Sequence, residues 1–160
     1  MKKILYIIPG LQESCDSKPY QLLADAAKDK SYTVICKNVD WEKPLSIQIF
    51  AVPRDAVVFG FSLGAILAWL IAQKHPIQQL ILASMTPHYS FTDPKIHKAF
   101  VKLMGVDFVD DVIHRLKPKH RAKKQTVLYG DREHEKGDAL IPQTGHRLNK
   151  RYVEAVMQLL

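Results

Sequence analysis

Cysteine is scarce in this sequence, which limits the chemistry that the chain can perform. Only Cys15 and Cys36 occur, and they lie far apart. Neither belongs to a C-x-x-C pair, and two cysteines cannot build a disulfide framework, so we expect free thiols in a reduced intracellular protein. No pair among the seven histidines has the spacing of a metal site. We therefore expect no metal and no cofactor.

Long apolar runs are also missing. Met1-Lys2-Lys3 followed by Ile4–Ile8 superficially resembles the start of a signal peptide, but Pro9-Gly10 ends the run and no small-residue cleavage site follows. No other stretch approaches the roughly 18 consecutive apolar residues that a membrane span requires. We expect a soluble, cytoplasmic protein without a membrane partner.

The remaining composition is that of an ordinary globular protein. The length of 160 residues fits a single domain, residues 1–160, and 47% hydrophobic with 24% charged residues excludes a disordered or low-complexity chain. The net charge of +7 invites a nucleic-acid interpretation. However, the one dense basic run, Lys117–Lys124, has no interleaved aromatic residues and is interpreted as a solvated linker. No nucleic-acid partner is expected.

Short apolar segments alternate with helical patterns along the chain. The predicted strands are Ile4–Ile8, Tyr32–Val39, Ala56–Phe59, Gln79–Ala83 and Thr126–Tyr129. The predicted helices are Tyr20–Lys30, Pro44–Val52, Leu63–Gln73, Arg151–Leu160 and two amphipathic helices within the intervening 30-residue stretch before Thr126. This alternation predicts an α/β fold, a three-layer α/β/α sandwich with a mostly parallel sheet. Such sheets bind ligands at the carboxyl ends of their strands, directly after Ile8, Phe59, Ala83 and Tyr129.

The segment Gly60-Phe61-Ser62-Leu63-Gly64 carries the strongest chemical signal. It is a G-x-S-x-G motif between a predicted strand and a predicted helix, the context in which a serine on a sharp turn becomes an exposed nucleophile. The glycines leave room for the neighbouring strand and helix, and the helix N-terminus favours a developing oxyanion. The alternative is a glycine-rich turn that merely packs closely.

With this motif the sequence resembles the α/β-hydrolase family, in particular its small, lidless serine esterases and thioesterases. Four marks carry the resemblance: Pro9-Gly10-Leu11, the motif around Ser62, Gly130-Asp131-Arg132-Glu133, and Gly145-His146. The resemblance implies that Ser62 is the nucleophile and His146 the general base. The order of serine, acid and histidine along the chain is also the order found in this family. It also implies an oxyanion hole from the backbone N–H groups of Leu11 and Leu63.

The acid has two candidates. Family members commonly carry it three residues after the glycine that ends the strand, which selects Glu133, and the longer glutamate side chain can still reach an imidazole across a loop. Asp131 follows that glycine directly, and aspartate is the commoner residue in this role. We favour Glu133 and keep Asp131 as the rival.

The end of the sheet is expected to depart from the family pattern. Only 13 residues lead from Glu133 to His146, where the family usually has a helix and another parallel strand. A parallel crossover needs roughly a dozen residues or more, so Ala139–Pro142 is not expected to form a full parallel neighbour of Thr126–Tyr129. We expect a minimal α/β-hydrolase fold whose C-terminal strand is trimmed or lost. A binding protein on a catalytically decayed scaffold is therefore the alternative function.

The resemblance implies that the stretch after Ala83 occupies the position of the family's acyl-pocket lining and lid insertions. Met85, Tyr89 and Phe91 would suit an apolar acyl group, with ordinary core or surface packing as the alternative. The insertion is too short for a large lid. We predict a serine hydrolase of carboxylic esters or thioesters with a small-molecule substrate. Acyl length, the choice between ester and thioester, and the oligomeric state stay open.

Overall fold

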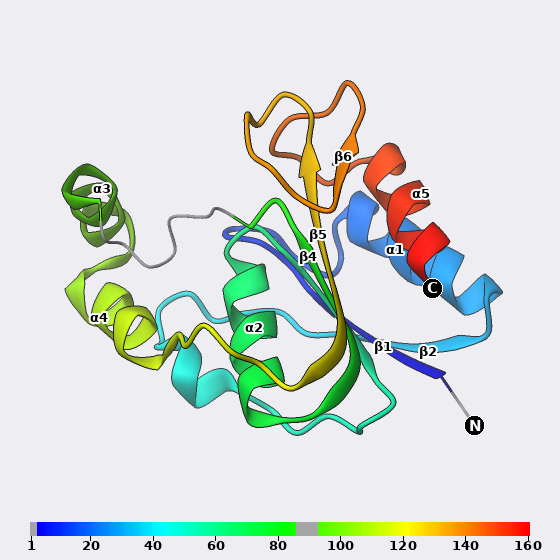
Figure 1. Cartoon of the computed structure of the whole chain (residues 1–160), viewed down its shortest axis with the longest axis horizontal. Helices are drawn as coiled ribbons and strands as arrows, with labels where there is room; N and C mark the ends of the chain where they lie inside the picture. The colour runs from blue at the N-terminus through cyan, green and yellow to red at the C-terminus, as the bar shows by residue number, and fades with distance from the viewer. Residues whose placement is uncertain (1–2, 86–92) are drawn as a thin grey trace.

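The computed structural model describes residues 3–85 and 93–160, which alternate between strands and helices (Figure 1). The strands are β1 (Lys3–Ile8), β2 (Tyr32–Cys36), β3 (Val57–Phe61), β4 (Ile77–Ala83), β5 (Ala122–Gly130) and β6 (Ala139–Ile141). The helices are α1 (Lys18–Asp29), α2 (Gly64–Lys74), α3 (Pro94–Met104), α4 (Val106–Arg115) and α5 (Lys150–Leu159), with a short 3-10 helix, η1 (Leu45–Gln48). The predicted α/β class is confirmed.

The described strands form one parallel sheet in the order β2-β1-β3-β4-β5-β6. The chain runs outward from β1 to β2 and then crosses back to β3 on the other side of β1. The strand order therefore reverses between β1 and β3. In open α/β sheets the crevice at such a reversal, at the carboxyl ends of the strands, is where ligands bind.

The two faces of the sheet carry separate helical layers, as a three-layer sandwich requires. Along β1, Leu5 and Ile7 belong to the core shared with α1 and α5, whereas Tyr6 and Ile8 belong to the core shared with α2 and α4. Figure 1 shows α1 and α5 side by side on one face and α2 on the other. The period-2 alternation of a strand thus divides one continuous apolar run between two cores.

The helices differ in how much of their surface is covered. Eight residues of α2 are buried, because this helix lies between the sheet and the elements η1 and α4. In contrast, α3 has no buried residue and lies away from the sheet. Asp93 starts α3 by accepting hydrogen bonds from the N–H groups of Lys95 and Ile96. The segment predicted as the helix Pro44–Val52 forms only the single turn of η1.

The end of the sheet differs from the prediction in one respect. Ala139–Ile141 does pair in parallel with β5, in the register Leu128 to Ala139 and Gly130 to Ile141. The strand is trimmed to three residues, as expected, and its shortness makes the parallel connection possible. After Gly130 the chain needs to return only to the level of Leu128 before it pairs again. A short loop therefore suffices where a full strand would need a longer crossover.

The prediction that both cysteines are free is wrong. Cys15 and Cys36 form a disulfide, with their Cα atoms 5.8 Å apart, which ties the loop after β1 to the last residue of β2. The sequence separation hid this pairing because parallel β1 and β2 bring their carboxyl ends together. The expected free thiols were one argument for a cytoplasmic location, and the disulfide removes that argument. The cytoplasmic location stays a prediction. In the described part of the chain, no helix is long and apolar enough to cross a membrane.

Candidate active site

Ser62 occupies a sharp turn between β3 and α2. Its φ is +52°, a left-handed conformation that non-glycine residues rarely adopt, and its N–H donates to the carbonyl of Ala83 on β4 at 2.8 Å. Such backbone strain persists only where the surrounding structure holds it. The turn places the hydroxyl at the carboxyl edge of the sheet, beside the reversal of strand order.

Two glycines make this turn possible, as the motif predicts. A Cβ on Gly60 would lie 2.7 Å from the Cα of Ala65, so no side chain fits between β3 and α2. A Cβ on Gly64 would overlap the carbonyl oxygen of Pro9. The amino end of α2 therefore packs directly against the segment that follows β1, and this contact brings two distant parts of the chain to one place.

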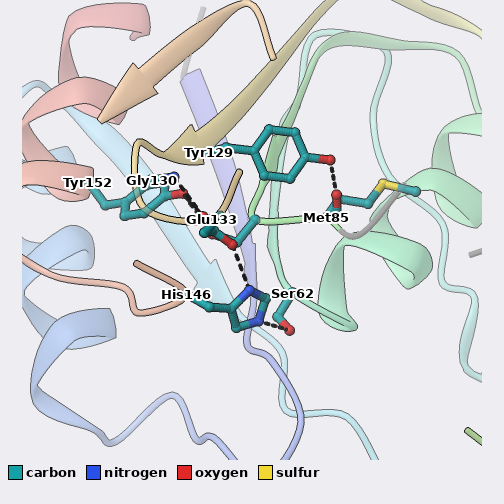
Figure 2. Close-up of polar contacts among 8 residues, drawn as sticks. Ser62, Met85, Tyr129, Gly130, Glu133, His146 and Tyr152 are labelled. Atoms are coloured by element: carbon teal, nitrogen blue, oxygen red, sulfur yellow. Dashed lines mark hydrogen bonds and ion pairs between the residues drawn. The ribbon is translucent and has the colours of Figure 1, made fainter. Parts of the chain in front are cut away.

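His146 joins Ser62 to a carboxylate (Figure 2). The Ser62 hydroxyl donates to Nε2 of His146 at 2.7 Å, and Nδ1–H of His146 donates to Oε1 of Glu133 at 2.7 Å, in the tautomer that carries its proton on Nδ1. The side chain of Glu133 is 7% exposed and that of His146 is 48% exposed. The carboxylate is thus shielded from water while the imidazole and hydroxyl face outward.

Asp131, the rival acid, does not contact the imidazole. Its carboxylate accepts the backbone N–H groups of Gln143 at 2.9 Å and Thr144 at 3.0 Å, and these hydrogen bonds lower its pKa. It therefore anchors the loop that carries His146. Glu133 reaches the imidazole because its N–H donates to the carbonyl of Gly130, which turns the chain back toward the site.

Glu133 is held as an anion. Burial by itself would raise the pKa of its carboxyl, but hydrogen bonds from His146, Ser84 and the N–H of Gly130 outweigh burial and lower the pKa below its ordinary value. An ionised carboxylate beside Nδ1 fixes the imidazole tautomer and stabilises the imidazolium that forms when Nε2 takes a proton.

Leu11 and Leu63 were predicted to supply oxyanion donors. Leu63 follows Ser62 directly in the chain. Leu11 follows Gly10, and a Cβ on Gly10 would lie 3.2 Å from the Cβ of Ser62, so the segment that carries Leu11 also lies close to Ser62. Within residues 3–85 and 93–160, no hydrogen bond occupies the backbone N–H of Leu11 or Leu63. Neither group is committed to an acceptor in this part of the chain, and the oxyanion role of both residues stays a prediction.

The loop that carries Leu11 is held in place by hydrogen bonds to Glu13 and Tyr20. The N–H of Gly10 donates to Oε2 of Glu13 and to the hydroxyl of Tyr20, each at 3.1 Å, and the Tyr20 hydroxyl donates to the same carboxylate oxygen at 2.5 Å. The disulfide at Cys15 continues this bracing. Sequence reasoning missed these contacts, since neither Glu13 nor Tyr20 belongs to a motif.

Met85 ends the described segment before residues 86–92. Its side chain is half-buried and packs against the core on the α2 face, and its carbonyl accepts a hydrogen bond from Tyr129. Burial, with the carboxylates of Glu135 and Glu133, raises the pKa of Tyr129 to about 12, which keeps this donor protonated. The acyl-pocket role of Met85 stays a prediction, and Tyr89 and Phe91 lie outside the described residues.

A pocket of about 230 Å³ opens beside the imidazole. It is lined by Tyr129, Arg132, Glu133, Glu135 and His146. Its wall is a mixture of polar and apolar surface and carries charges of both signs. No group of three histidine, cysteine, aspartate or glutamate side chains that could hold a metal ion occurs among the residues that the structure describes.

Two further residues at the site were not predicted individually. Ser84 follows β4 as Ser62 follows β3, with a φ of +50°, and its hydroxyl reaches Oε2 of Glu133 at 2.7 Å. The rule that chemistry sits just after a parallel strand pointed to this position without assigning it a task. Tyr152 of α5 contacts the same oxygen at 3.1 Å, and no sequence signal singled it out.

Comparison with known proteins identifies the architecture. No family model and no curated protein matches the sequence. Solved structures do match: MGS-MChE2, an alpha/beta hydrolase enzyme from a lagoon-sediment metagenome, at a TM-score of 0.68 and 16% identity, covers 99% of this chain and 89% of that one. Alpha/beta hydrolase domain-containing protein 10 from mouse matches at a TM-score of 0.65 and 14% identity, over 98% of this chain and 87% of that one. Est1E from Butyrivibrio proteoclasticus matches at a TM-score of 0.64 and 13% identity, over 98% of this chain and 84% of that one. The chain has the α/β-hydrolase fold.

Proposed function

We propose that this protein is a serine hydrolase that cleaves a carboxylic ester or thioester. The observation that carries the proposal is the unbroken chain of hydrogen bonds from Ser62 through His146 to Glu133, both at 2.7 Å. A serine hydroxyl is a weak nucleophile unless a base removes its proton, and an imidazole needs a carboxylate to fix its tautomer and stabilise its charge. These requirements are met on a strained strand-to-helix turn.

The reaction follows from this arrangement in two half-reactions. Oγ of Ser62 bonds to the acyl carbon while His146 takes its proton, and the N–H groups of Leu11 and Leu63 receive the oxyanion. When the tetrahedral intermediate collapses, the bond to the leaving group breaks and the imidazolium gives it the proton. Water, deprotonated by His146, then attacks the acyl-enzyme, and the carboxylic acid leaves with the serine restored.

The pocket beside the imidazole favours a small leaving group in the proposed substrate. His146 delivers the proton to the leaving group, so the pocket beside the imidazole is on that side of the scissile bond. Its volume of about 230 Å³ suits a short alcohol or thiol, and its mixed wall offers charged partners to any hydrogen-bonding group on that alcohol or thiol. A screen of acyl esters should therefore favour esters of short alcohols over esters of long alkyl alcohols.

The test is intact-mass analysis after treatment with a fluorophosphonate. The native protein is expected to take up one adduct, whereas Ser62→Ala takes up none and His146→Ala reacts far more slowly. Ser46→Ala is the matched control, because this serine bonds to Asp111 away from the site and its loss should leave labelling unchanged. A folded native protein that takes up no adduct would contradict the proposal.

The alternative of a decayed binding scaffold was motivated by a last strand that is trimmed or lost. That strand is present as β6, although it is trimmed, and Glu133 before it and His146 after it lie within hydrogen-bond distance of each other. This contact favours the hydrolase over the alternative.

A further inference from the structure

The carboxylate oxygen of Glu133 that does not face His146 is surrounded by donors. Oε2 lies 2.6 Å from the N–H of Gly130, 2.7 Å from the hydroxyl of Ser84 and 3.1 Å from the hydroxyl of Tyr152. The two hydroxyls are themselves 2.7 Å apart. Donors from the residue after β4, from the end of β5 and from α5 thus converge on one oxygen atom.

Each hydroxyl has a single proton, which limits how the group can be arranged. The shortest distances favour Tyr152 donating to Oγ of Ser84, and Ser84 donating to Oε2 of Glu133. Burial raises the pKa of Tyr152 above its usual value, so that this chain keeps both protons. Ser84 then donates its proton to the carboxylate while Tyr152 donates its proton to Ser84, and this arrangement stabilises the anionic form of Glu133.

Neither hydroxyl is needed for packing. Ser84 and Tyr152 are both 0% exposed, and an alanine and a phenylalanine would fill the same space. The Tyr152 ring already packs edge-on against Phe61, at 5.8 Å between centroids, and Phe61 in turn packs against the ring of His146. A buried hydroxyl costs free energy unless it is hydrogen-bonded, so these two carry a polar task that an apolar core does not require.

We propose that Ser84 and Tyr152 are positioning residues for the reaction. This inference rests on the proposed function. Together with the N–H of Gly130 they hold Glu133 ionised and fixed in rotation, so that Oε1 stays on Nδ1 of His146. They act only through Glu133 and do not touch the reacting atoms.

The proposal predicts the direction of a pH effect. Removing a donor from Oε2 leaves a more basic carboxylate, which binds a proton more readily itself or stabilises the imidazolium of His146 more strongly. In both cases the Glu133–His146 pair becomes protonated at higher pH. The acid limb of the pH–rate profile therefore moves to higher pH, which a purely structural role would not cause.

The experiment compares Ser84→Ala and Tyr152→Phe with Tyr32→Phe. The control also loses a buried tyrosine hydroxyl, one that donates to the carbonyl of Leu160 away from the site. We expect kcat of Ser84→Ala to fall roughly tenfold at nearly unchanged KM, with the acid limb raised by about one pH unit. Tyr152→Phe should shift the limb less in the same direction, since Tyr152 acts on Oε2 mainly through Ser84, and Tyr32→Phe should not shift it.

A second readout does not depend on activity. The imidazole of His146 is titrated by NMR in a Ser62→Ala background, with and without each substitution. A raised midpoint in both variants supports the proposal. Unchanged midpoints in both variants, with circular dichroism showing both folded, would overturn it. An inactive, unlabelled native protein would overturn the proposed function instead, and the NMR comparison would still decide the roles of Ser84 and Tyr152.

Discussion

Two carboxylates, two residues apart, share the support of His146. Glu133 contacts the imidazole directly. Asp131 instead accepts hydrogen bonds from the backbone N–H groups of Gln143 and Thr144, which shortly precede His146 in the chain. The sequence narrowed the acid to this pair and favoured Glu133, but it kept Asp131 as a rival. The choice depends on the tight turn at Gly130, which directs one side chain inward and the other toward the neighbouring loop.

Substituting each carboxylate by its amide should separate these roles. Glu133→Gln keeps the shape but removes the charge and tends to reverse the tautomer, so we expect kcat to fall by about 10³–10⁴-fold. Asp131→Asn should lower kcat by less than about tenfold, because the imidazole keeps its carboxylate. Steady-state kinetics on an activated ester measure both, and equal losses would contradict the assignment.

Asp131 should make folding stability depend on pH. Its pKa is lowered in the folded chain, so the folded state binds fewer protons than the unfolded state around the ordinary aspartate value of 3.8. Its contribution is present above that value and is lost as the pH falls through the lower, folded pKa. Urea unfolding from neutral to acid pH should show a shallower decline for Asp131→Asn than for the native chain.

At the scale of secondary-structure elements, the strands and helices with continuous or periodic apolar patterns could be predicted. The predicted helix Leu63–Gln73 agrees with α2 to within one residue at each end. It could be predicted because α2 is buried on nearly all sides and its sequence is therefore almost continuously apolar. The misses are segments whose partners decide their structure. Ala122–Gln125 forms the start of β5 although two lysines occupy it, because β4 offers a pairing edge there. The linker interpretation of Lys117–Lys124 therefore holds only for residues 117–121.

The contact of α2 with the segment after β1 should be intolerant of any side chain. Gly64→Ala would drive a methyl group into backbone atoms of Pro9, and we expect it to cost about 1–3 kcal/mol of unfolding free energy. Gly145→Ala is the matched control, since a Cβ there meets nothing within 4 Å. Urea denaturation measures both, and equal effects would mean that the close approach is not required.

The tether between the loop after β1 and β2 should stabilise the fold. Cys15 and Cys36 enclose a separation of 21 residues, for which loop-closure entropy predicts about 3 kcal/mol. We expect the Cys15→Ser/Cys36→Ser variant to unfold at lower urea concentration than the native chain. Dithiothreitol should reproduce this loss in the native chain and leave the variant unaffected; a native chain insensitive to reduction would contradict the prediction.

At the scale of the whole molecule, the location of the site could be predicted but its internal contacts could not. The rule that parallel sheets bind at their carboxyl edge placed Ser62, Ser84 and the Gly130 turn together. Which side chains contact one another there depends on distances in the folded chain, and the spacing of residues along the sequence does not give these distances. The 0% exposed Tyr152 looks, in sequence, like any apolar contact of an amphipathic helix.

The short β6 leaves the first half of β5 without an outer neighbour among the described residues. Lys123 and Lys124 lie on this edge, and charged residues discourage edge-to-edge pairing between chains. We expect Lys123→Gln/Lys124→Gln to raise the weight-average mass with protein concentration in light scattering. Lys98→Gln/Lys102→Gln removes the same charge from exposed α3 positions and should stay unchanged.

The residues of the candidate site, from the predicted donor Leu11 to Tyr152, span nearly the full chain. During synthesis, Ser62 therefore emerges from the ribosome long before α5, the helix whose Tyr152 contacts the carboxylate of Glu133. A ribosome-bound chain that lacks α5 should be inert toward acylating reagents. Reactivity at Ser62 thus reports completed folding, and it would serve as a built-in assay for refolding from urea.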